Sequence, residues 1–241
     1  SEKLWTGVIN ILPSFLGNFT VEVAVGLVTY MSKGTINQPD FMSYPISNLL
    51  SSLVRFFPQE PMTWNTVLER VIEDEHRAIR QRALELLAEG RAADEQTWHI
   101  IRVWAQENKD KDIRQRALEL LAKGRAADEQ TWHIIRVWAQ EDEDRDIRQY
   151  ALGLLVAGRA ANKQTWQFIR VRAQEDNDRY VRRRALELLA AGRAADEQTW
   201  QFIRVRAQED EDEHVRRCAL ELLAAGRAAD EQTWQFIRVR A

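Results

Sequence analysis

The sequence predicts an all-α protein, a solenoid of helical hairpins that repeat every 34 residues behind an N-terminal helical cap. Tryptophan recurs at this interval, at positions 64, 98, 132, 166, 200 and 234. The nine residues GRAADEQTW begin at positions 90, 124, 192 and 226, and a variant, GRAANKQTW, begins at 158. A fixed period without insertions indicates structural units that each bury an apolar face by stacking on their neighbours.

The first 61 residues differ in composition from the rest of the chain. They hold all the prolines, and all the methionines except Met62. This change places a boundary near Pro61, with a hydrophobic helical cap or small module at 1–61 and the repeats at 62–241. The repeat units are expected to start near 62, 96, 130, 164 and 198, with a final half-repeat from 230.

The N-terminal segment allows more than one interpretation. Residues 4–21 carry no charge, which is typical of a membrane span, but Asn10, Pro13 and Gly17 favour two short segments joined by a turn. Residues 19–31 fit either a strand or a helix, and Lys33 and Gly34 favour the helix because they are typical of a helix end. A further helix is expected from Pro45 to Phe57. The segment would then cap the first repeat, and a small signalling or assembly module is the alternative.

From the second hairpin on, the first helix follows an aspartate or asparagine. Asp94 and its equivalents precede runs such as EQTWHIIRVWAQ, and Asn162 stands at the same place in the divergent copy. Both residue types are strong N-caps. Trp98, Ile101 and Ala105 have the spacing of a buried helical stripe.

The second helix follows an acidic turn such as ENKDKD. In the second copy its apolar face is formed by Ile113, Ala117, Leu120 and Leu121. Gly124 is expected to end this helix in a left-handed conformation.

The second helix and the turn before it carry a family resemblance. The run from Asp210 to Leu220, DEDEHVRRCAL, is similar to HEAT repeats, which combine an Asp-rich turn, Val-Arg and an Ala/Leu-rich second helix. The resemblance covers residues 62–241 and implies a right-handed α-α superhelix whose second helices line the concave side. The array resembles those that follow NACHT-type modules in bacterial, including cyanobacterial, STAND proteins, although this sequence has no phosphate-binding glycine loop. The resemblance implies a non-catalytic recognition scaffold, the sensor array of a signalling or defence protein.

Comparison of the copies with one another separates constant from variable positions. In the second helix, positions 78, 82, 85 and 89 and their equivalents vary, and their spacing places them on one helix face. We call this face the variable stripe. One hypothesis is that the stripe binds a protein partner, since Tyr and Arg are enriched at interface hot spots; the alternative is drift at solvent-exposed positions. Its candidate residues are Arg82, Asp112, Arg116, Asp146, Tyr150, Tyr180, Arg184 and His214.

Two further features are open to a binding or a structural interpretation. Trp104 and Trp138 form a second candidate patch if their rings are exposed. The alternative is that they are repacked contacts between repeats, because later copies carry arginine at these positions and phenylalanine at the position of Ile100. Five arginines at equivalent positions suggest a phosphate ladder, but pairing with turn aspartates such as Asp142, Asp176 or Asp210 is favoured. These arginines are Arg80, Arg114, Arg148, Arg182 and Arg216.

The remaining composition bears on chemistry and location. The four histidines are scattered, and the sequence contains no motif for a nucleophile, metal or nucleotide, so we expect neither an enzyme nor a cofactor. A net charge of −3 gives no indication of nucleic acid. Cys218 is the only cysteine, which favours a reducing, cytoplasmic setting.

The alternative function is that of an accessory enzyme or DNA-handling module, because HEAT-like folds also serve as bilin lyases and DNA glycosylases. The final half-repeat has no polar capping helix after it. We expect that the native protein continues, or that this end is covered by self-association.

Overall fold

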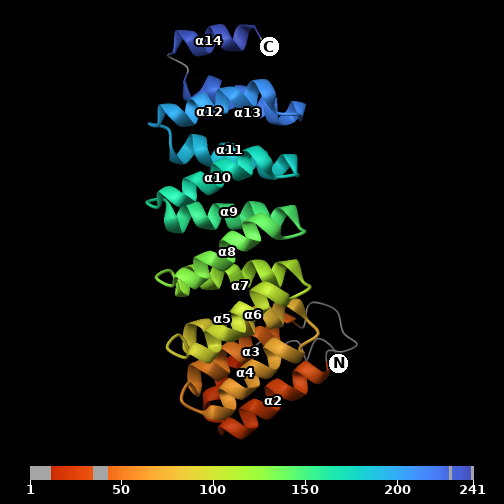
Figure 1. Ribbon diagram of the computed structural model, residues 1–241. Helices are drawn as coiled ribbons and strands as arrows, with labels where there is room; N and C mark the ends of the chain where they lie inside the picture. Colours follow the sequence, from red (N-terminus) through yellow and green to blue (C-terminus); the bar gives the residue numbers. More distant parts are fainter. Residues whose placement is uncertain (1–11, 35–42, 228–229, 240–241) are drawn as a thin grey trace. The chain divides into compact units, whose positions relative to one another are not determined.

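The computed structural model describes residues 12–34, 43–227 and 230–239. Within these residues the chain forms helices joined by short turns and contains no strand (Figure 1). The predicted all-α helical repeat of the solenoid class is therefore confirmed. The chain divides into two compact units, residues 1–124 and 125–241.

The first unit holds two hairpins behind an N-terminal pair of helices. The second helices of the hairpins, α5 and α7, pack on each other. The N-terminal pair is arranged in the same way, because α2 packs on α3 and α4 while α3 packs on α5. The elements are η1 (Leu16–Asn18), α2 (Val21–Gly34), α3 (Ser43–Phe56), α4 (Pro61–Glu73), α5 (Arg77–Gly90), α6 (Glu95–Glu107) and α7 (Lys111–Gly124).

The helix α3 continues the register of the repeats although its sequence does not. It begins and ends 34 residues before α5, and both helices have 14 residues. Leu49, Leu50 and Leu53 are fully buried, at positions equivalent to the buried Ala83, Leu84 and Leu87 of α5. The N-terminal pair therefore covers the first repeat with a surface of the same periodicity.

The expectations for the N-terminal segment are confirmed in part. Residues 19–31 fall mostly in α2, so the helix was the correct alternative to the strand. The next helix begins at Ser43, two residues before the expected start. Residues 12–15 are helical and run into η1, whereas 4–11 lie outside the described residues. Among the described helices, none has the length and apolar character needed to cross a membrane.

The second unit is built of the same hairpins. Each first helix packs on its second helix, and the second helices α9, α11 and α13 pack in series. The elements are α8 (Glu129–Glu141), α9 (Arg145–Arg159), α10 (Lys163–Glu175), α11 (Arg179–Gly192), α12 (Glu197–Glu209), α13 (Glu213–Gly226) and α14 (Glu231–Arg238).

The nine-residue motif forms the junction at which each first helix begins. The Oδ1 atom of Asp94 accepts a hydrogen bond from the amide of Gln96 at 3.0 Å, and Asn162 caps α10 in the same way. Trp98 is buried, and its Nε1 donates to the carbonyl of Ala92 at 2.8 Å. The predicted caps are therefore confirmed, and the indole is fixed to the turn that precedes its own helix.

The motif glycine has a different role from the expected one. Gly124 is the last residue of α7, and no residue in the described part of the chain has a positive φ, so the left-handed helix end was wrong. A Cβ atom on Gly124 would instead overlap Cη2 of Trp98. The same overlap would occur at Gly90, Gly158, Gly192 and Gly226 with the tryptophan of their own hairpins. Glycine is required here because it leaves room for an indole ring.

We predict that Gly124→Ala lowers the free energy of unfolding by about 1–3 kcal/mol, the usual cost of overpacking a core. Gly26→Ala is the control: it lies inside α2 with no atom within 4 Å of the added Cβ, so it should raise helix stability by up to about 1 kcal/mol. Urea unfolding of both variants measures the difference. Trp98→Phe in the Gly124→Ala background should restore part of the loss; equal losses with and without the tryptophan would contradict the contact.

We also predict that the capping aspartates make stability depend on pH. The pKa of Asp196 lies below its ordinary value because its carboxylate accepts hydrogen bonds from the Thr199 hydroxyl, 2.9 Å away, and from the Gln198 amide. A lowered folded-state pKa contributes stability that is present above about pH 4 and is lost as the pH falls through the folded-state value.

Asp196→Asn keeps an N-cap without a titrating carboxylate, so its unfolding temperature should fall less steeply than that of the wild type as the pH is lowered. Thermal unfolding followed by circular dichroism at a series of pH values below neutrality tests this. Asn162→Asp is the reciprocal variant, and its unfolding temperature should fall more steeply with decreasing pH than that of the wild type. Identical acid profiles for the three proteins would show that the caps do not contribute to it.

Candidate functional site

The variable stripe lies on second helices that pack against one another within each unit. In the first unit α5 and α7 bring Arg82 and Arg116 to neighbouring positions, and in the second unit α9, α11 and α13 align Tyr150 with Arg184. Every predicted stripe residue reaches solvent at least in part. Arg82, Asp112, Arg116, Tyr150 and Arg184 are half-buried, whereas Asp146, Tyr180 and His214 are exposed.

The stripe of the first unit is a network of paired charges. Arg116 bridges two carboxylates, Glu85 of the preceding second helix at 2.7 Å and Glu119 of its own helix at 2.6 Å. Arg82 donates to Glu85 at 2.8 Å and to the hydroxyl of Ser51 at 2.9 Å. Arg82 and Arg116 therefore each contact a helix earlier in the chain as well as their own helix.

The pKa values in this network reflect the pairing. Burial alone would lower the pKa of Arg116, but the hydrogen bond to Glu119 and the charge of Glu85 outweigh it and raise the pKa. Burial would raise the pKa of Glu119, yet its bonds from Lys123 and Arg116 lower it. The Glu119 carboxylate and the Arg116 guanidinium thus stabilise one another in their charged forms.

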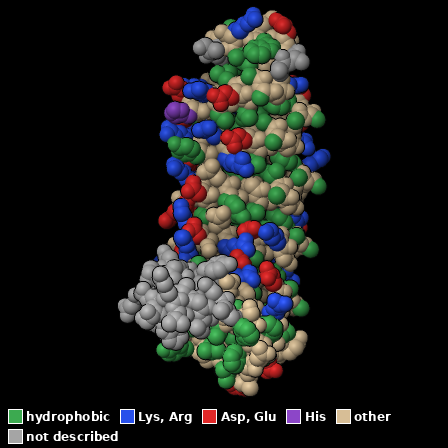
Figure 2. All heavy atoms as spheres, turned by 180° about the vertical axis from the view of Figure 1, so that it is seen from behind, with side chains coloured by type: hydrophobic (Ala, Val, Ile, Leu, Met, Phe, Trp, Pro, Cys, Tyr) green, Lys and Arg blue, Asp and Glu red, His purple; other side chains and the backbone are tan. Residues whose placement is uncertain are grey.

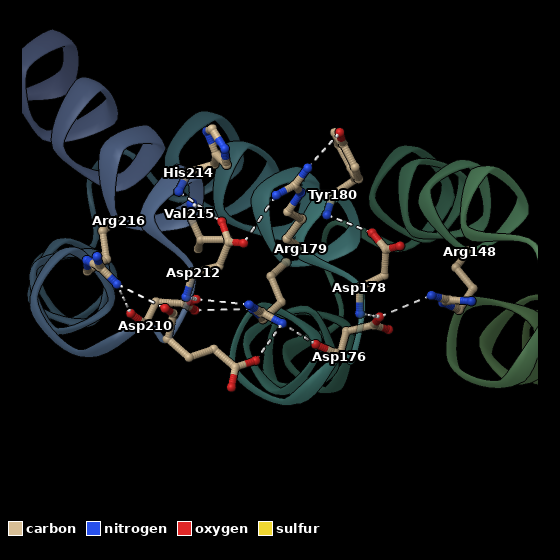
Figure 3. A network of polar contacts seen from close by, with 12 residues as sticks. Arg148, Asp176, Asp178, Arg179, Tyr180, Asp210, Asp212, His214, Val215 and Arg216 are labelled. Carbon is tan, nitrogen blue, oxygen red and sulfur yellow. Dashed lines mark hydrogen bonds and ion pairs between the residues drawn. The ribbon is translucent and has the colours of Figure 1, made fainter.

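In the second unit the stripe contains an aromatic ring between two arginines. The guanidinium carbon of Arg145 lies 4.3 Å from the ring centre of Tyr180, and that of Arg179 lies 5.0 Å from it. Arg179 also donates to the Tyr180 hydroxyl at 3.3 Å (Figure 3). This hydrogen bond and the charge of Arg179 lower the pKa of Tyr180. Arg–aromatic stacking of this kind holds an exposed ring in a defined orientation.

Carboxylates balance the two arginines at Tyr180. Asp212 pairs with Arg179 at 3.5 Å and accepts hydrogen bonds from the amides of His214 and Val215 (Figure 3). Asp178 lies 3.9 Å from Arg145. A polar hollow beside the ring is lined by residues of both signs, among them Arg145, Arg179, Arg182, Asp178, Glu211 and Asp212. Acidic and basic side chains are also interspersed on the face shown in Figure 2.

The column of equivalent arginines is a structural ladder. Arg182 is 3 % exposed and forms two bonds to the carboxylate of Asp210, at 3.0 and 3.2 Å, while donating to the carbonyl of Asp176 at 2.8 Å. Arg148 pairs with Asp176 at 3.3 Å. The interpretation as pairing with turn aspartates is confirmed for Asp176 and Asp210, because these donors are bonded inside the stack.

The ladder adapts where the aspartate is missing. Asn108 stands at the position equivalent to Asp142, and Arg80 pairs instead with Asp110, two residues further on, at 3.4 Å. Arg114 and Arg216 each donate to two carbonyls of the turn before their own helix. One bonding pattern therefore holds the turns in both units.

The two tryptophans of the second candidate patch are only partly exposed. Trp104 and Trp138 are both half-buried, so neither is an exposed ring. Where the copies carry the other residue combination, Phe168 lies between Arg172 of its own helix and Arg136 of the preceding first helix, both 5.7 Å from the ring centre. The coupled change at these positions is therefore part of the contact between first helices.

Several residues at the stripe were not found by sequence comparison. Arg145 and Arg179 stand one position before the variable column, and Ser51 belongs to the N-terminal pair of helices. The column that contains Arg77, Lys111, Arg145, Arg179 and Glu213 varies as much as the stripe does, and this variation was the signal that could have identified it.

Among the described residues, no group of three His, Cys, Asp or Glu side chains is placed to hold a metal ion.

Comparison of the sequence with known proteins found no relative. No model of a known family matches the chain, and no curated protein matches it in sequence.

We predict that Arg182→Ala lowers the free energy of unfolding by about 3–5 kcal/mol, because it leaves the buried carboxylate of Asp210 without its cation. Arg217→Ala is the control: its side chain is 76 % exposed and pairs with Glu221, so the change should cost no more than about 0.5 kcal/mol. Chemical denaturation measures both. Equal, small losses would contradict the structural role of the ladder.

Proposed function

We propose that this chain is a non-catalytic scaffold that recognises a protein partner through the variable stripe of its second helices. The observation that carries the proposal is the separation of constant from variable residues. The tryptophan–glycine contact, the caps and the arginine ladder repeat in the buried and turn positions, whereas one solvent-accessible face of the second helices changes from copy to copy. A surface with this arrangement differs from repeat to repeat without altering the frame.

The chemistry of the stripe favours a protein as the ligand. Arginine and tyrosine are enriched at the hot spots of protein interfaces, and Tyr180 is held exposed between Arg145 and Arg179. Binding to nucleic acid depends on a basic surface whose cations are free to neutralise phosphates. The stripe arginines are instead paired with carboxylates, as Arg116 is with Glu85 and Glu119.

The resemblance to HEAT arrays extends the proposal to a cellular role. In that setting the chain would act as the recognition part of a bacterial signalling or defence protein in the cytoplasm, resembling the arrays that follow NACHT-type modules. Recognition by an array of this kind needs no catalytic group of its own, because it requires only a partner-specific surface on a rigid frame.

We predict that removing the stripe abolishes partner binding without unfolding the protein. Peptides selected by the wild-type protein from a displayed random library are the ligands, and their dissociation constants are measured by biolayer interferometry. A variant of the second unit with five serines should bind them at least about tenfold more weakly. Its changes are Asp146→Ser, Tyr150→Ser, Tyr180→Ser, Arg184→Ser and His214→Ser.

The matched control places five serines on exposed positions of the first helices in the same unit. These positions are His133, Gln140, Gln167, Gln174 and Gln201. The control should keep wild-type affinity, and both variants should keep the helical circular dichroism spectrum. A second stripe variant, Arg82→Ser with Asp112→Ser and Arg116→Ser, tests the first unit. Folded stripe variants that bind every selected peptide as the wild type does would refute the proposal.

A further inference from the structure

One column of the variable stripe carries a single interruption. The residues at equivalent positions are Glu85, Glu119, Gly153, Glu187 and Glu221. Glycine inside a helix costs about 1 kcal/mol relative to alanine, so its presence calls for a reason. Gly153 lies in the middle of α9, and neither backbone conformation nor packing supplies that reason.

The other glycines of the repeats show the contrast. A Cβ at Gly124 or Gly158 would overlap a tryptophan ring, whereas the nearest atom to a Cβ at Gly153 is Nη2 of Arg184, at 3.9 Å. That distance is an ordinary van der Waals contact, so a larger side chain fits there. Since no positive φ occurs among the described residues, the backbone of Gly153 is open to any residue as well.

The equivalent place in the first unit shows what the glycine removes. There Arg116 bonds to Glu85 of the preceding second helix at 2.7 Å and to Glu119 of its own helix at 2.6 Å. Arg184 is the counterpart of Arg116, and Gly153 is the counterpart of Glu85. Among the described residues, Arg184 thus retains only the carboxylate of its own helix, Glu187, at 3.3 Å.

The loss of the second carboxylate leaves the arginine more open to solvent. The side chain of Arg184 is 43 % exposed, whereas that of Arg116 is 28 % exposed. Its guanidinium reaches to within van der Waals distance of the space that the missing glutamate side chain would fill. A guanidinium has five N–H donors in a fork that matches a carboxylate, so Arg184 can donate to a second carboxylate as well as to Glu187.

We propose that Gly153 and Arg184 form a receptor for a carboxylate of the partner protein. An Asp or Glu side chain of the partner takes the place of the absent glutamate and pairs with Arg184 as Glu85 pairs with Arg116. This inference rests on the proposed function, since it names the chemistry that one part of the stripe recognises.

The surroundings favour a carboxylate over a phosphate. Glu187 stays beside Arg184, so a singly charged group reproduces the two-carboxylate arrangement seen at Arg116, whereas a doubly charged group would meet stronger repulsion. Tyr150 precedes Gly153 by three residues on the same helix face, which places a half-buried aromatic ring beside the opening. The partner residue is therefore an acidic one in a peptide segment that also offers an apolar contact.

The test uses the full chain and peptides selected by it from a displayed random library. The wild-type protein should enrich peptides that share an acidic residue, and replacing that residue with alanine should weaken binding at least about tenfold. Gly153→Glu should weaken the binding of the acidic peptides to the same extent, because the new carboxylate pairs with Arg184 in place of the peptide's carboxylate. The peptides in which alanine replaces the acidic residue should bind the wild type and Gly153→Glu with equal affinity. In this double-mutant cycle each change removes the same contact, so the second change has no further effect.

Two matched variants separate charge from volume. Gly153→Ala adds only a Cβ at van der Waals distance from Arg184 and should weaken binding the least of the three changes at this position. Gly153→Gln fills nearly the same volume as glutamate without its charge and should weaken binding more than Gly153→Ala but less than Gly153→Glu does. Arg184→Gln gives an independent measurement and should reproduce the loss seen with Gly153→Glu. Circular dichroism confirms that each variant is folded.

The outcomes distinguish this inference from the proposed function. If the five-serine stripe variant loses binding while Gly153→Glu and Arg184→Gln keep it, the carboxylate receptor is wrong and the scaffold stands. Selected peptides without a shared acidic residue also overturn the receptor. If no peptide is selected, or if the stripe variant binds as the wild type does, both are overturned.

Discussion

In each complete hairpin, an indole ring of the first helix lies over a glycine at the end of the second helix, in the space where a Cβ would be. This contact fixes the distance and the angle between the two helices at the open end of the hairpin. The same ring donates a hydrogen bond to the turn before its own helix, as Trp98 does to Ala92, so it also fixes the hairpin to the preceding one. At the other end, Arg182 joins its own turn to Asp210 of the next. Two interactions, one apolar and one ionic, thus set the spacing of the helices on which the variable stripe lies.

The arrangement explains why the charges of the stripe are distributed as they are. A column of arginines on adjacent helices repels itself unless carboxylates stand between its members. In the first unit Glu85 and Glu119 satisfy this condition for Arg116, and the raised pKa of the arginine and the lowered pKa of Glu119 both reflect it. Around Tyr180, Asp178 and Asp212 do the same for Arg145 and Arg179. Charge compensation of this kind lets the stripe carry many ionic groups while the frame stays stable.

The frame could be predicted from sequence because its determinants are local or periodic. An N-cap such as Asp94 acts on the next two residues, and the positions of Trp98, Ile101 and Ala105 follow from helical geometry. The role of Gly124 was missed because the same glycine suits a left-handed helix end and a close contact, and only the position of Trp98 decides between them. The sequence did not reveal that α3 continues the 34-residue period, because Leu49 stands where the repeats have alanine. The stacking of Arg145 on Tyr180 depends on how α9 and α11 are rotated against each other, which the spacing of residues within one helix does not specify.

In a repeat protein of this regularity, a departure from the pattern has a more definite meaning than in an irregular fold. Most departures in the stripe exchange one side chain for another, and the new side chain can contact a neighbouring helix, as Tyr180 does with Arg145. Gly153 is different because it deletes a side chain, and the arginine that the side chain would have paired with stays in place. A frame held by tryptophan, glycine and the arginine ladder does not collapse into such an opening, since the helices on either side are fixed by contacts elsewhere. A rigid stack of helices is therefore what would keep the opening available to the proposed partner carboxylate.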